Sequence, residues 1–74
     1  MSSHIEELRK KLNRMKALVN TVKAGVNVRT IAMTRGEISN IYNNMKPHFN
    51  AVAGGPNGKM AAEIMNNAQK IVHG

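Results

Sequence analysis

The sequence predicts an all-α fold: a small three-helix protein with a long N-terminal amphipathic, coiled-coil-like helix and a short extended, β-like connector. Three observations lead to this prediction. Apolar residues recur at helical spacing in three separate segments, capping sequences mark the predicted starts of two of them, and a cluster of Gly and Pro separates the last two. A chain of 74 residues is long enough for one domain, 1–74.

The small size of the chain limits how much its core can stabilise it. A domain of this length gains only about 3 to 5 kcal/mol from its core, and many such domains add disulfides, a metal or another chain. The sequence has no Cys, which excludes disulfides and thiolate metal sites. We therefore expect a homo-oligomer or a complex with another protein.

The first helix is predicted over about residues 4–24. Ser3 and Glu6 have the spacing of a capping box, and no Gly or Pro interrupts the segment before Gly25, a plausible left-handed stop. The apolar residues of this helix alternate in spacing between three and four, the pattern of a coiled-coil seam. This apolar seam consists of Ile5, Leu8, Leu12, Met15, Val19 and Val22.

The connector is predicted over residues 25–33. Its β-branched residues, Val26, Val28, Thr30 and Ile31, favour a short strand or an extended segment. A lone strand needs a partner strand, and the sequence offers no second one. We therefore predict an extended connector, or a strand that pairs across a subunit interface.

The second helix is predicted over about residues 35–46, with a possible extension to 53. Thr34 and Glu37 have the spacing of a second capping box. Pro47 lacks an amide hydrogen and disfavours helical geometry in the residue before it, so the helix is expected to end or kink there.

The third helix is predicted over about residues 59–73, after a loop at 54–58. The loop sequence Gly-Gly-Pro-Asn-Gly is the clearest break in the chain. The apolar residues after it recur at helical spacing and are Met60, Ala61, Ile64, Met65, Ala68, Ile71 and Val72.

The side chains needed for catalysis are scarce. Cys and Asp are absent, and His4, His48 and His73 are scattered without metal-ligand spacing. The segment 54–59 superficially resembles a phosphate-binding loop, but the spacing of its glycines and the residue after its Lys do not fit that motif. We therefore predict no catalytic residue, no cofactor site and no metal site, and we expect a protein that is not an enzyme.

The charge of the chain is strongly positive. Eleven Lys and Arg against four Glu give a net charge of +7, and the isoelectric point is near 10.4. Such a charge favours nucleic acid, an acidic protein or an anionic membrane surface as partner. Six of the eleven cations lie on the first predicted helix. These N-terminal cations are Arg9, Lys10, Lys11, Arg14, Lys16 and Lys23.

The positions of these cations restrict what covers the apolar seam. With Ile5 at heptad position a, residues 9, 16 and 23 fall at e and Lys11 falls at g, so self-pairing would bring like charges together. Three arrangements remain. The chain's own second and third helices cover the seam, an acidic helix of another protein covers it, or a higher oligomer directs the cations toward nucleic acid.

Membrane association is not expected from the sequence. No apolar stretch approaches the roughly 20 residues of a spanning helix, and the first residues lack the basic and apolar regions of a secretory signal. The first predicted helix has no Trp or Phe to enter a membrane surface. We expect a cytoplasmic protein, or one within a virion or nucleoid.

Two functions follow from these features. The first is a small basic accessory protein that binds the nucleic-acid backbone or an acidic macromolecule through the N-terminal cations, without chemistry of its own. The alternative is a protein-interaction or structural module that uses the apolar seam, for example a virion component or an inhibitor of a larger host protein.

Overall fold

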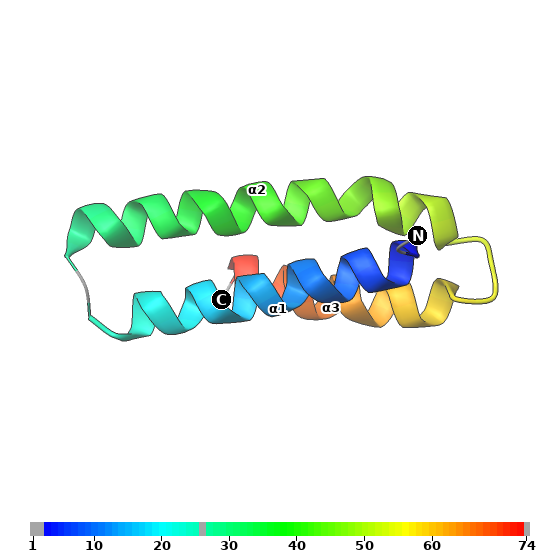
Figure 1. Cartoon of the computed structure of the whole chain (residues 1–74), viewed down its shortest axis with the longest axis horizontal. Helices are drawn as coiled ribbons and strands as arrows, with labels where there is room; N and C mark the ends of the chain where they lie inside the picture. Colours follow the sequence, from blue (N-terminus) through cyan, green and yellow to red (C-terminus); the bar gives the residue numbers. More distant parts are fainter. Residues whose placement is uncertain (1–2, 26, 74) are drawn as a thin grey trace.

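Three helices make up the described part of the chain, residues 3–25 and 27–73 of a computed structural model: α1 (His4–Lys23), α2 (Val28–Val52) and α3 (Gly58–His73). All three pairs of helices pack against each other. In Figure 1, α1 and α2 run antiparallel, and α3 lies beside α1 over part of its length. The predicted all-α, three-helix fold is confirmed, and the molecule is elongated, with extents of 43 × 24 × 15 Å.

The start of α1 is fixed by the cap that the sequence indicates. The Ser3 side chain accepts a hydrogen bond from the Glu6 amide at 3.1 Å, which satisfies one of the amides that a helix start leaves unpaired. Glu6 and Glu7 lie in the first turn, where the helix dipole favours negative charge. At the other end the chain turns at Gly25, which has a φ of +79°.

The extended connector predicted over residues 25–33 is wrong for its larger part, because α2 already begins at Val28. Val26 lies outside the described residues. The actual cap is Asn27, whose side-chain oxygen accepts a hydrogen bond from the Thr30 amide at 2.9 Å. β-branched residues disfavour a helix only slightly, and the cap together with packing against α1 outweighs that preference.

The predicted start of the second helix near Thr34 is also wrong, because α2 begins six residues earlier, at Val28. Thr34 lies inside α2 with only 6% of its surface exposed, and Glu37 lies 3.9 Å from Arg14 of α1 instead of capping α2. Thr34 and Ile38 are four residues apart and both are buried, so they share the core-facing side of α2.

Pro47 does not end α2, which continues to Val52 and is the longest of the three helices. Phe49 and Val52, beyond the proline, are partly buried against the core. Their packing compensates for the backbone hydrogen bond that proline cannot donate. The possible extension to 53 is therefore closer to the structure than an end at 46.

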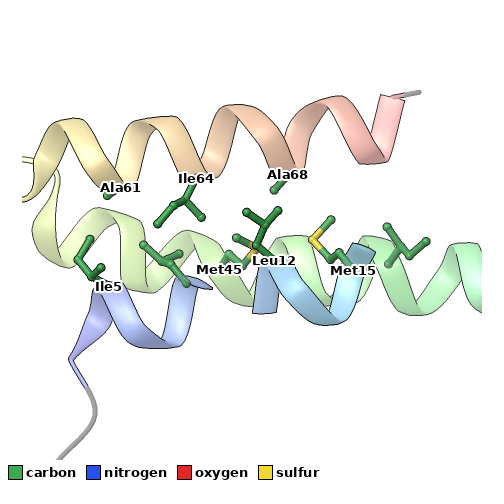
Figure 2. Close-up of a cluster of buried hydrophobic side chains, with 9 residues drawn as sticks. Ile5, Leu12, Met15, Met45, Ala61, Ile64 and Ala68 are labelled. Atoms are coloured by element: carbon green, nitrogen blue, oxygen red, sulfur yellow. The ribbon is translucent and has the colours of Figure 1, made fainter. Parts of the chain in front are cut away.

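The core lies between the three helices and is almost entirely apolar. Leu8 and Met15 of α1 and Met45 of α2 are completely buried. Figure 2 shows Leu12 and Met15 directed toward the space that α2 and α3 enclose with α1. The buried hydrophobic residues are Ile5, Leu8, Leu12, Met15, Ile38, Met45, Ala61, Ile64 and Ala68.

Candidate binding site

The N-terminal cations lie mostly on the surface of the molecule. Arg9, Lys10, Lys16 and Lys23 are exposed, and the described residues give none of these four an ion pair. Because α1 turns its apolar side toward α2 and α3, these cations form a charged surface around its remaining sides.

The other two N-terminal cations contact carboxylates. Lys11 is partly buried and lies 3.4 Å from Glu7, one turn earlier on α1. Arg14 lies 3.9 Å from Glu37 of α2, and both side chains are more than half exposed. Exposed pairs of this kind contribute at most about 1 kcal/mol, so Arg14 can exchange its carboxylate for another anion at little cost.

Positive charge also covers parts of α2 and α3, which the predictions from sequence did not include in the site. Two of the eleven Lys and Arg, Lys11 and Arg14, lie in ion pairs, so nine have none within the described residues, and all nine are exposed. Composition could have indicated this, because four Glu cannot pair with eleven cations. The five cations outside α1 are Arg29, Arg35, Lys46, Lys59 and Lys70.

The apolar seam is divided between the core and the surface. Ile5, Leu8, Leu12 and Met15 are buried in the chain's own core, so α2 and α3 cover most of the seam. Val19 and Val22, the last two positions of the seam, remain half-buried and line a groove.

This end groove has a volume of about 400 Å³. It exists because α3 ends at His73, whereas α1 and α2 extend farther, toward their connection at the left of Figure 1. The residues that line it come from the last five residues of α1, the first half of α2 and the last turn of α3. They are Val19, Val22, Lys23, Arg35, Ile38, Ser39, Ile71, Val72 and His73.

Two histidines that the sequence separates by 44 positions meet in the fold. The Nδ1 atoms of His4 and His48 lie 2.9 Å apart. No local pattern could have paired them, because they belong to different helices. Across residues 3–25 and 27–73, no three His, Asp or Glu side chains are grouped closely enough to hold a metal ion.

Two further findings bear on function. Among the described residues, no helix is both long enough and apolar enough to cross a membrane. The chain has no match among protein-family models, curated proteins or solved structures.

Proposed function

We propose that this protein binds the phosphate backbone of nucleic acid through the N-terminal cations, without catalysing a reaction. The observation that carries the proposal is the excess of exposed cations: nine Lys and Arg have no ion pair within the described residues. Lysine and arginine side chains that neutralise phosphates displace the cations condensed on the nucleic acid, and the release of these cations into solution drives binding.

The arrangement of cations on α1 supports contact with more than one phosphate. Arg9 and Lys16 are separated by two helical turns and lie on the same side of α1, about 10 Å apart along its axis. Lys10 extends the charge around the helix, and Arg14 can add to it by exchanging Glu37 for phosphate. A rigid helix holds these charges in place before binding, which lowers the entropic cost.

The same surface offers little for reading base sequence. Tyr42 and Phe49, the two aromatic residues apart from histidine, are partly buried against the core instead of being presented for base stacking. Lys46 lies over the Tyr42 ring at 5.3 Å and covers it further. We therefore propose binding directed to the backbone and weakly dependent on sequence.

The test is the salt dependence of binding to a labelled DNA duplex of about 20 base pairs, followed by fluorescence anisotropy. The triple variant Arg9→Gln, Lys10→Gln, Lys16→Gln removes three exposed cations of α1 and keeps good helix formers in place. Its logarithmic salt slope should be smaller than that of the unmodified protein by roughly 2 to 3.

A matched control removes the same charge elsewhere, with Arg29→Gln, Lys59→Gln and Lys70→Gln on α2 and α3. This control should keep most of the affinity and of the salt slope. If both variants lose affinity equally, binding responds to the net charge of the protein and is not specific to the face of α1. If the unmodified protein binds neither DNA nor RNA at about 50 mM salt, the proposal is wrong.

A second candidate function, that of a protein-interaction module, is favoured by the end groove and its apolar lining. Light scattering at low and high salt, with absorbance at 260 nm across the peak, distinguishes the two candidates. Co-purified nucleic acid that salt removes supports the first, and a protein complex that resists salt supports the second. Either partner would be met in the cytoplasm, or within a virion or nucleoid.

A further inference from the structure

The end groove continues the surface on which α3 packs. Along most of their length α1 and α2 together receive α3, through residues such as Leu12 and Met45 that face Ile64 in the shared core. Beyond the end of α3, the same two helices continue side by side without a third helix against them in the described chain (Figure 1).

The floor of the groove is apolar in the same way as the covered part of the surface. Val19 and Val22 continue the seam whose earlier positions pack in the core, and Ile38 continues the core-facing side of α2. A surface formed by two helices that already accepts one helix therefore extends into the groove. This continuity favours a helix as occupant over a compact small molecule.

The rim of the groove carries cations on two of its three sides. Lys23 comes from α1, Arg35 from α2 and His73 from the last turn of α3, while none of the described residues that line the groove is a carboxylate. Lys23 and Arg35 are exposed and have no ion pair within the described residues. An occupant with acidic flanks would pair with both of them.

We infer that the end groove binds an acidic amphipathic helix of a partner protein. Apolar residues of that helix, spaced three and four apart, contact Val19, Val22 and Ile38, and its carboxylates pair with Lys23 and Arg35. The lining residues of α1, Val19 to Lys23, and those of α2, Arg35 to Ser39, each span about 6 Å along their helix, which accommodates about one turn of the partner. A second copy of this chain is a poor occupant, because its net charge of +7 would meet a basic rim.

This inference goes beyond nucleic-acid binding, because phosphates need no apolar floor. It shares Lys23 with the N-terminal cations, but none of Arg9, Lys10 and Lys16 lines the groove. The triple variant described above should therefore lose affinity for DNA and keep its affinity for an acidic helix. Failure of one proposal leaves the other intact.

The probe is a synthetic peptide of about 14 residues with leucines spaced three and four apart, glutamates at the other positions and a covalent staple that keeps it helical. Binding is followed by two-dimensional ¹H–¹⁵N NMR at about 150 mM salt. The largest changes in amide chemical shift should occur at Val19, Val22, Ile38 and Ile71. Two control peptides should bind at least tenfold more weakly: one with the leucines scrambled around the helix, and one with lysines in place of the glutamates.

Variants of the protein test the groove from its own side. Lys23→Glu with Arg35→Glu reverses the charge of the rim and should weaken peptide binding roughly tenfold or more. Lys46→Glu with Lys59→Glu makes the same change of net charge away from the groove and should have a much smaller effect. Ser39→Trp places a bulky ring at an exposed residue of the groove wall and should also weaken binding.

Several outcomes would overturn the inference. Equal binding by the two charge-reversed proteins would show that the peptide responds only to net charge, and equal binding of the scrambled peptide would show that the apolar floor is not used. The fatty acid dodecanoate, which also combines an apolar chain with a carboxylate, serves as a competitor. If it binds more tightly than the peptide and displaces it, the groove is a site for an aliphatic carboxylate and not for a helix. Circular dichroism of each variant checks that a loss of binding is not a loss of folding.

Discussion

The imidazole Nδ1 atoms of His4, at the start of α1, and His48, in the second half of α2, lie 2.9 Å apart. The ring centroids are 5.1 Å apart and the ring planes are inclined by 50°. At this distance one Nδ1–H donates a hydrogen bond and the other Nδ1 accepts it, because a neutral imidazole has one nitrogen of each kind. The contact ties the beginning of α1 to the antiparallel α2.

This hydrogen bond predicts that the two rings hold different tautomers. In alkaline solution, where imidazoles are neutral, long-range ¹H–¹⁵N NMR should find the proton on Nδ1 in one ring and on Nε2 in the other. His73 belongs to α3 and serves as a reference. In the variant His4→Ala, the tautomer ratio of His48 should no longer depend on a partner ring and should approach that of a free imidazole. Identical tautomers for His4 and His48 in the unmodified protein would contradict the contact.

Pro47 lowers the stability of α2, and its replacement should raise it. Proline in a helix interior costs roughly 3 kcal/mol relative to alanine, because it cannot donate the hydrogen bond to the residue four positions earlier. Part of this cost is offset because proline also restricts the unfolded chain, by about 0.4 to 1 kcal/mol. We expect Pro47→Ala to increase the free energy of unfolding by about 1 to 3 kcal/mol, measured by urea denaturation.

The control for this prediction is Asn50→Ala, a nearby exposed position of α2 that already has an amide hydrogen. It should change the free energy of unfolding by less than about 0.7 kcal/mol, the difference in helix propensity. A Pro47→Ala protein no more stable than the unmodified protein would mean that the packing of Phe49 and Val52 depends on the proline.

The features of the fold that could be predicted from the sequence are those with local causes. The Ser3 cap sets the start of α1, and the break around Gly54 to Gly58 separates α2 from α3. The regular spacing of the seam indicated that it packs against helices, and its first four residues are buried in the core. In each case neighbouring residues determine the structure, so a pattern within a few turns is sufficient.

The features that could not be predicted depend on contacts between helices. The pair Thr34 and Glu37 has the spacing of a helix cap, yet the burial of Thr34 and the contact of Glu37 with Arg14 place both inside α2. The end groove depends on the relative lengths of three helices, and the sequence predicted the start of α2 seven residues too late and left its end open between 46 and 53. Asn27, the actual cap of α2, is the exception, because it carries a local signal that its β-branched neighbours obscured.

Met15 and Met33 provide a matched test of the core. Met15 is completely buried, whereas 63% of the surface of Met33 is exposed. Met15→Ala should lower the free energy of unfolding by about 2 to 5 kcal/mol, through lost contacts and the cavity it leaves. Met33→Ala should change it by no more than about 0.5 kcal/mol. Urea denaturation followed by far-ultraviolet circular dichroism measures both, and similar losses in the two variants would contradict this core.

Replacing glycine by alanine should have opposite effects on the stability of the protein at Gly25 and at Gly36. Gly25 has a φ of +79°, which an alanine adopts only at a cost of roughly 1 kcal/mol or more. Gly36 lies inside α2 with no neighbouring atom within 4 Å of an added Cβ, so alanine there should stabilise the helix by about 1 kcal/mol. Thermal unfolding should therefore show a lower midpoint for Gly25→Ala and a higher one for Gly36→Ala. Because the substitution adds the same methyl group in both proteins, shifts of the same sign would mean that α2 does not extend through Gly36 or that the chain does not turn at Gly25.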